Sequence, residues 1–125
     1  MNSIIPDTNF LIYLAKYNLL GRLSDYSRIL LLKQVLKELV VLSKSEKLKE
    51  KDRLFAQLVI EFIVKLKENI AFIENIEGNA DDAIQELAEK EKIPVGTMDK
   101  ALVEKLQKNK IKIIFIRQKS LLQEK

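Results

Sequence analysis

The sequence has 125 residues, a length that fits one compact domain, and it combines 47% hydrophobic and 32% charged residues with a formal net charge of +4. It contains no Cys and no His, which excludes disulfides, thiolate and imidazole metal sites, and catalysis by Ser-His or Cys-His pairs. Charged residues interrupt every long apolar stretch, and residues 1–7 lack the pattern of a secretory signal, so we expect a cytoplasmic protein that does not cross a membrane.

The first half of the chain predicts one short strand followed by helices. Residues 4–6 form the predicted strand, which stops at a turn because Pro6 does not suit the middle of a central strand. Helical spacing of apolar residues follows up to residue 18, and again across residues 28–43 and 54–67. The charged stretch between the last two segments has no Gly or Pro and predicts an exposed helix-to-helix connection.

The second half alternates strands with helices. Strands are predicted at residues 71–76, 93–97 and 111–116, with one helix starting near Asn79 and another over residues 100–107. This alternation predicts an α/β fold of right-handed βαβ units, with a central parallel sheet of four to five strands and helices on both faces. We expect residues 1–125 to form a single domain in which residues 117–125 are a short tail.

The predicted helix over residues 54–66 carries many large apolar side chains. Two interpretations are open: an ordinary core helix, or a face through which the protein forms a homodimer. The residues concerned are Phe55, Leu58, Val59, Phe62 and Leu66.

Acidic residues follow several of the predicted strands. Asp7 comes directly after the first strand, Asp81 and Asp82 open the helix after the second, and Asp99 follows the third. Ligands of open α/β sheets bind beyond the carboxyl ends of the strands. We therefore expect these acids at one rim, where Glu38 joins them if its helix packs across the opening.

Acids crowded at one rim predict a metal-dependent hydrolase. Crowded carboxylates repel one another and resist ionisation, and a bound cation removes that cost. Their hard oxygen atoms favour Mg²⁺ or Mn²⁺, which can activate a water and neutralise charge on a scissile phosphate. Neutral hydrogen bonds from Thr8 and Asn9 could position that water or a phosphate oxygen.

Each of these acids also has a purely structural interpretation. Asp7 and Asp99 suit helix N-caps, and Asp81 and Asp82 suit the first turn of a helix, where negative charge is favourable. Glu38 alone is compatible with a solvated helix residue.

The C-terminal quarter is basic. Residues 100–125 contain eight Lys and Arg and two Glu, which gives this end a charge of +6 against −2 for the rest. A basic end suits a polyanionic partner such as RNA, although solvated surface lysines have the same composition. The candidates for RNA contacts are Lys100, Lys105, Lys108, Lys110 and Lys112.

Four segments, in this order and across nearly the whole chain, together resemble a PIN domain: IIPDTNFLIYL, QVLKELVVL, GNADDAIQELAEKEKIPVGTMDKALVEKL and IKIIFIR. The resemblance is closest to small archaeal PIN proteins, similar to the toxin half of VapBC pairs and to PIN nucleases of ribosomal RNA processing. It implies a Rossmann-like sheet, Mg²⁺- or Mn²⁺-dependent endoribonuclease activity, and an antitoxin or ribonucleoprotein partner.

The resemblance also assigns roles to single residues. The family's four acids fall, in order, on Asp7, Glu38, Asp81 and Asp99. For the third of these acids, Asp82 is the second choice after its neighbour Asp81. Thr97 begins the family's Thr-x-Asp pattern, but Met98 stands where Asn is common, which puts one polar contact near the metal in doubt.

Two other functions compete with the nuclease. A catalytically silent PIN-like module that binds RNA or a ribonucleoprotein would not need the acids that this chain retains. A phosphoryl-accepting receiver domain would share acids at strand ends, but its required set of an acidic pair, a middle Asp and a late Lys cannot be placed in this sequence.

Overall fold

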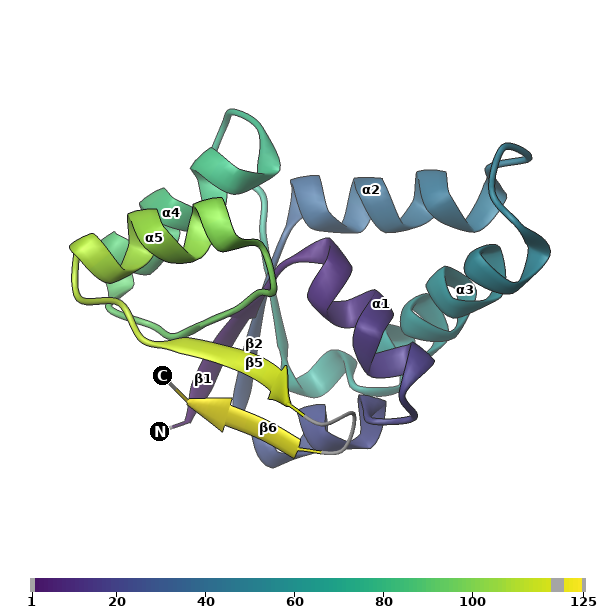
Figure 1. Cartoon of the computed structure of the whole chain (residues 1–125), viewed down its shortest axis with the longest axis horizontal. Coiled ribbons are helices and arrows are strands. Elements are labelled where there is room, and N and C mark those ends of the chain that lie inside the picture. The colour runs from purple at the N-terminus through teal and green to yellow at the C-terminus, as the bar shows by residue number, and fades with distance from the viewer. Residues whose placement is uncertain (1, 118–120, 125) are drawn as a thin grey trace.

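The computed structural model describes residues 2–117 and 121–124, which form a central sheet with helices on both of its faces (Figure 1). The strands are β1 (Ser3–Pro6), β2 (Arg28–Leu32), β3 (Ile70–Ile73), β4 (Val95–Gly96), β5 (Ile113–Arg117) and β6 (Leu121–Glu124). The α-helices are α1 (Thr8–Lys16), α2 (Lys33–Lys44), α3 (Glu50–Lys65), α4 (Ala80–Glu91) and α5 (Lys100–Lys108). Two short 3₁₀ helices, η1 (Leu20–Asp25) and η2 (Lys67–Asn69), precede β2 and β3.

The strand order β3-β2-β1-β4-β5-β6 places the chain reversal at the centre of the sheet. The first five strands of this order are parallel, and β6 is antiparallel to β5. From β1 the chain builds outward to β2 and β3, and it then returns to pair β4 with the other side of β1. The β1–β4 pair is therefore the topological switch point, next to which open α/β sheets form their ligand crevice.

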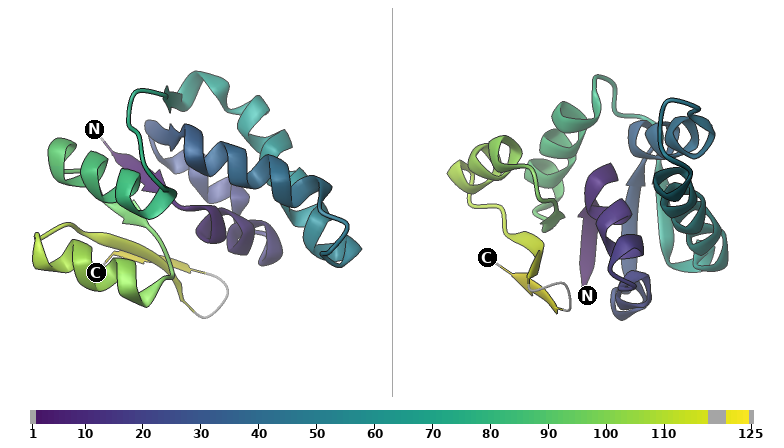
Figure 2. Two further views of the ribbon diagram at one scale, coloured as in Figure 1. Left: turned by 90° about the horizontal axis from the view of Figure 1, so that it is seen from above. Right: turned by 45° about the vertical axis from the view of Figure 1, so that its right-hand side comes forward.

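The helices divide between the two faces according to the direction in which the chain advances. α1, α2 and α3 lie on one side, and α4 and α5 lie on the other (Figure 2). This division confirms the predicted parallel sheet with helices on both faces. None of the described helices is long and apolar enough to cross a membrane.

The prediction of one helix over residues 28–43 was wrong, because its first part is β2. Residues Ile29 to Leu32 are all 3% exposed or less, so the strand is covered on both faces. A short strand buried on both faces has a continuous apolar run, which periodicity cannot distinguish from a buried helix. The helix α2 begins only at Lys33.

The expected short tail at residues 117–125 contains a further strand. Leu121–Glu124 form β6, which pairs with β5 from Arg117 to Ile114. Without β6, the N–H and C=O groups on that side of β5 would form an unpaired edge. Pairing of this edge is the physical reason for an element that the short apolar Leu-Leu pattern alone did not predict.

The helices α2 and α3 pack against each other and extend beyond the sheet (Figure 1). Ala56, Val59 and Ile63 form the buried stripe of α3, whereas Leu54 and Leu58 are 49% and 38% exposed. The helix is thus partly a core element. Whether its exposed side forms a homodimer stays a prediction.

Candidate active site

The switch point brings two strand ends and two helix starts together. Asp7 follows β1 and is the N-cap of α1, and Asp99 follows β4 and is the N-cap of α5. Asp81 lies in the first turn of α4, whose N-cap is Asn79. The structural interpretation of Asp7 and Asp99 as N-caps is therefore confirmed, and it coexists with their position at the rim of the sheet.

Asp7 is held in place from two sides. One carboxylate oxygen, Oδ1, accepts a hydrogen bond from the backbone N–H of Phe10 at 2.8 Å, and the other, Oδ2, accepts one from the hydroxyl of Thr97. The Thr97 oxygen in turn accepts the N–H of Asp99 at 3.1 Å. Both Asp7 and Thr97 are buried, so this chain of hydrogen bonds ties the ends of β1 and β4 to each other.

Gly96 allows this close approach. A Cβ atom at this position would lie 2.6 to 2.9 Å from three atoms of the Phe10 ring, closer than real contacts permit. Because Phe10 is in the first turns of α1, any larger residue at position 96 would push α1 away from the sheet. The absence of a side chain at Gly96 is thus a condition for the contact between Asp7 and Thr97.

The acids also interact through their charges. Burial raises the pKa of Asp7 to about 6, the hydrogen bonds from Thr97 and Phe10 oppose that rise, and the charges of Asp81 and Asp99 add to it. Burial likewise raises the pKa of Asp81; Asp99 and Asp82 add to that rise, while Lys105 opposes it. Three of the four predicted family acids therefore share one electrostatic field.

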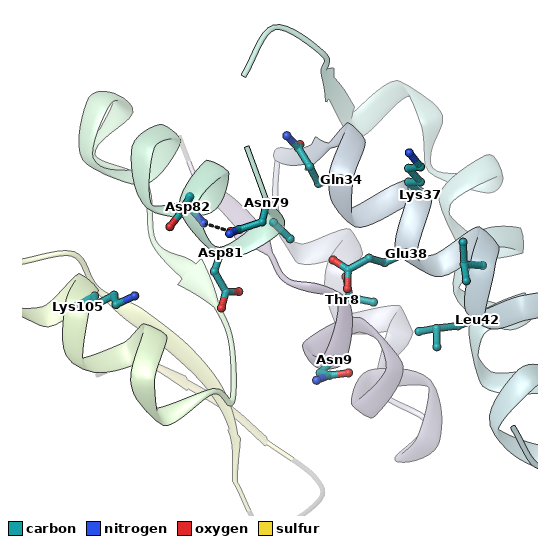
Figure 3. A pocket seen from close by; sticks show the side chains of 12 residues that line it. Thr8, Asn9, Gln34, Lys37, Glu38, Leu42, Asn79, Asp81, Asp82 and Lys105 are labelled. Carbon is teal, nitrogen blue, oxygen red and sulfur yellow. Dashed lines mark hydrogen bonds between the residues drawn. The ribbon is translucent and has the colours of Figure 1, made fainter. Parts of the chain in front are cut away.

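A cleft of about 850 Å³ opens beside these acids, between α1, α2, α4 and α5. Figure 3 shows the carboxylates of Asp81 and Glu38 entering it from opposite walls, with Thr8 next to Glu38 and Asn9 further along α1. Glu38 comes from α2, which packs across the opening as predicted. Asp82 also lines the cleft, although its side chain lies on the far side of Asp81 from Glu38.

The two walls are joined through α2. The Gln34 amide donates to the backbone carbonyls of Ile76 and Gly78, at 2.7 and 3.0 Å, and Lys33 pairs with Glu77 at 2.8 Å. These contacts hold the segment before α4, which fixes Asp81 relative to Glu38.

Two buried oxygen atoms in the cleft have no hydrogen-bond partner among the described residues. They are Oγ1 of Thr8, a residue only 6% exposed, and Oε1 of Gln34. A buried hydroxyl without a partner is costly, and such groups in native proteins indicate a water, ion or ligand. Oxygen atoms with unused acceptor capacity and carboxylates that resist ionisation together suit a hard divalent cation.

The carboxylates do not enclose such an ion as they stand. In the part of the chain that the structure describes, no group of three or more acidic side chains is arranged to hold a metal. Asp81, Asp99 and Glu38 are exposed at the rim, and one carboxylate oxygen of Asp99 already accepts hydrogen bonds from the backbone at the start of α5. The chemistry of the donors fits a divalent cation, and binding would require the exposed acids to turn toward Asp7.

The predicted lysines separate along α5. Lys105 lines the cleft and points toward Asp81, whereas Lys100 lines a different hollow beside Met98. Lys110 and Lys112 follow α5 and lie beside the residues that precede β4, at the opposite end of the strands from the acids. The sulfur of Met98 accepts a hydrogen bond from the backbone N–H of Ile116, with 3.3 Å between sulfur and nitrogen. Met98 does not line the cleft.

The cleft contains residues that the sequence analysis missed. Gln34, Lys37 and Asn79 line it together with Glu38. The signal was present, because positions 34, 37, 38 and 41 fall on one face of a helix. The predicted helix over residues 28–43 already contained these positions, but only the acidic residue among them was considered for the site.

Comparison with known proteins decides the family. The profile described as a PIN-like domain matches residues 4–119. The chain belongs to the PIN-like domain family. Ribonuclease VapC4 of Methanocaldococcus jannaschii is 38% identical to this PIN-like domain over 126 aligned residues, which cover 95% of the chain and 93% of the relative.

Solved structures agree on the fold of this PIN-like domain. A domain of a functionally unknown protein from M. jannaschii superposes with a TM-score of 0.64 at 13% identity, covering 94% of this chain and 92% of the other. VapBC2 from Rickettsia felis, bound to a promoter DNA fragment, gives a TM-score of 0.54 at 19% identity, covering 91% and 97%. At these identities the likeness concerns the fold alone.

Proposed function

We propose that this PIN-like domain is a Mg²⁺- or Mn²⁺-dependent endoribonuclease of the toxin type. The observation that carries the proposal is the shared electrostatic field of Asp7, Asp81 and Asp99 at the switch point, beside a cleft with a buried hydroxyl that has no partner among the described residues. Repulsion among these acids is unfavourable for the protein alone, and a cation would remove it. The ribonuclease name of the relative at 38% identity supports RNA as the substrate.

The roles follow from the positions of the residues. Asp7, Asp81 and Asp99 would hold the cation, with Glu38 from the opposite wall and Asp82 as a further ligand. The bound cation would lower the pKa of a water and neutralise charge on the scissile phosphate. Thr8 and Asn9 line the same cleft, where they can orient that water or a phosphate oxygen, and Thr97 holds Asp7.

Lys105 is the residue placed to meet the substrate. It lines the cleft and faces the acids, so it can contact a phosphate next to the one that is cut. An antitoxin is the partner that we propose, because the relative carries a VapC name and a VapBC assembly shares the fold. Ribosomal RNA processing has no comparable support from these relatives.

Cleavage of RNA with and without metal tests the proposal. Purified protein should cut single-stranded or loop RNA in Mg²⁺ or Mn²⁺ and stop in EDTA. Asp81→Asn and Glu38→Gln should each lower the rate at least about 100-fold, the scale of losing a charged group that acts on the transition state. Asp52→Asn, which removes an equal charge from the exposed first turn of α3, should leave the rate unchanged.

A thermal melt provides a second, independent readout. Mn²⁺ at 100 times its Kd should stabilise the wild type by about 2.7 kcal/mol, and Asp81→Asn should lose most of that gain. A wild type that melts identically in Mn²⁺ and EDTA, and cuts none of several RNAs, would instead indicate the catalytically silent RNA-binding module.

A further inference from the structure

A pair of stacked tyrosines lies on α1, just beyond the cleft. The ring centroids of Tyr13 and Tyr17 are 5.8 Å apart, with an angle of 14° between the ring planes. The Nζ atom of Lys16 lies 5.8 Å from both centroids. Two parallel rings and one ammonium group thus form a single compact surface, which we call the tyrosine platform.

The helix aligns this platform with the cleft. Tyr13 is four residues after Asn9, which lines the cleft, so the two side chains project from the same face of α1. Side chains of a helix lean toward its N-terminus, which carries the Tyr13 ring toward Asn9 and the acids. Six residues separate Tyr13 from Asp7, a distance of about 9 Å along the helix axis.

Tyr17 lies beside Tyr13, one helical turn further toward the C-terminus of α1, with its ring plane nearly parallel to that of Tyr13. Tyr17 is half-buried and packs against the core, whereas Tyr13 is 37% exposed. Part of the Tyr13 ring is therefore accessible to a ligand, while Tyr17 anchors the pair to the core. An exposed aromatic ring next to an anchored one suits stacking of a flat group.

The lysine adds the charge that such a ligand needs. Among the side chains of residues 2–117, no carboxylate forms an ion pair with Lys16. Its ammonium group is held over the aromatic rings, an arrangement that cation–π attraction favours. An aromatic face next to a cation that lacks an anionic partner is the combination with which proteins bind single-stranded nucleic acid: the base stacks and the phosphate is neutralised.

We infer that the tyrosine platform is a base-stacking subsite for single-stranded RNA, which binds a nucleotide next to the scissile phosphate or the one beyond it. This inference rests on the proposed ribonuclease function and specifies its substrate. A strand that crosses the acids would run along α1, with a base on Tyr13 and a phosphate beside Lys16. Stacking does not distinguish one base strongly from another, so the subsite would select unpaired RNA rather than a sequence.

Metal-free binding tests this inference separately from cleavage. The probes are oligoadenylate of about ten residues and a ribose-phosphate chain of equal length that lacks bases, both followed by fluorescence anisotropy in EDTA. The wild type should bind oligoadenylate more tightly. Tyr13→Leu should weaken oligoadenylate binding roughly five- to thirty-fold, equivalent to about 1–2 kcal/mol, and leave binding of the base-free chain unchanged.

Matched variants define the outcome. Tyr13→Phe should keep the wild-type preference because the ring remains, and Lys16→Gln should weaken both probes alike. Phe72→Leu removes another exposed ring, 49% exposed on β3, and should change nothing. Thermal melts of each variant show whether the fold is intact.

Three results would overturn the inference. One is equal affinity of the wild type for the two probes while RNA is still cleaved. Another is that Tyr13→Leu binds oligoadenylate as tightly as the wild type does. If that variant at the same time no longer binds a protein partner, the tyrosine platform is a protein-binding surface and not an RNA subsite. If the wild type neither binds nor cleaves any RNA, the proposed function itself is wrong, and this inference falls with it.

Discussion

The two sides of the candidate site, the ends of β1 and β4 on one side and the helix α2 across the cleft on the other, are built in different ways. On the β1–β4 side, Asp7 and Thr97 are buried and joined by hydrogen bonds, and Asp7 also caps a helix. On the α2 side, Glu38 is exposed on the surface of a helix that extends past the sheet. On the β1–β4 side, the same residues serve the candidate site and hold the fold together. On the α2 side, a residue of the candidate site can be replaced without disturbing the core.

This difference explains which acids destabilise the metal-free protein when they are ionised. A buried carboxylate with a raised pKa is a group that the native state would rather keep protonated. Glu38 is exposed on α2 and makes no described hydrogen bond that the fold depends on, so its side chain is available for a ligand. Substitutions on the two sides should consequently affect stability and activity in different proportions.

The largest expected effect is the pH dependence that Asp7 imposes on metal-free stability. Its pKa rises from 3.8 to about 6 in the folded protein. Below pH of about 4 the carboxyl is protonated in both states and imposes no cost. Between about 4 and 6 the unfolded chain releases its proton first, so stability falls as the pH rises, by about 3 kcal/mol in total for a shift of about two units.

Asp7→Asn should remove this dependence. In EDTA at pH 7 the variant should be more stable than the wild type by up to about 3 kcal/mol, while activity is lost; Asn retains a capping oxygen for the Phe10 N–H. Urea unfolding at pH 4 and pH 7 measures the difference. Asp52→Asn is the matched control, and its stability should change with pH as that of the wild type does. A less stable Asp7→Asn at pH 7 would mean that the charge of Asp7 supports the fold.

The sequence was sufficient to predict the acidic rim. Asp7 and Asp99 were placed correctly because residues directly after parallel strands must lie at one edge of the sheet. Glu38 was predicted only on the condition that its helix crosses the opening, which the packing of α2 satisfies.

Other features depend on long-range pairing that no local pattern contains. The β1–β4 contact joins residues about ninety positions apart, and the bond between Thr97 and Asp7 exists only because of it. Lys110 was grouped with Lys105 by composition, but α5 runs back along the sheet and carries the residues after it to the opposite end. Charge counts along a sequence do not reveal that reversal.

A smaller effect distinguishes two buried threonines, Thr97 beside Asp7 and Thr8 in the cleft. Thr97→Val removes the donor to Asp7 and the acceptor of the Asp99 N–H, and should destabilise the protein by about 1–3 kcal/mol. Thr8→Val removes a hydroxyl without a described partner, and should change stability by less than about 0.5 kcal/mol or raise it.

Activity completes the comparison of the threonines. Both variants should cleave RNA more slowly, Thr97→Val because Asp7 loses its position and Thr8→Val because the ligand loses a contact. Thr97→Ser should restore both stability and rate. Denaturant melts and cleavage rates on the same preparations measure the two effects, and a Thr8→Val variant with full activity would remove Thr8 from the site.

The smallest expected effect concerns the lysines of α5. Substituting them tests whether RNA contacts only the part of α5 that lies near the acids. Lys105 lines the cleft, whereas Lys108 lies in the last turn of α5, nearer the end that is remote from the acids. A lysine that neutralises a phosphate of single-stranded RNA releases a counterion, and its loss lowers the slope of log K against log salt by about 0.7. Lys105→Gln should therefore flatten this slope, and Lys108→Gln should not, although each removes one positive charge from the same helix.

Anisotropy titrations of a labelled single strand at several salt concentrations provide the slopes. Equal flattening by both variants would show that RNA follows the whole basic surface of α5 rather than the cleft, and it would weaken the contrast between the two ends of the sheet.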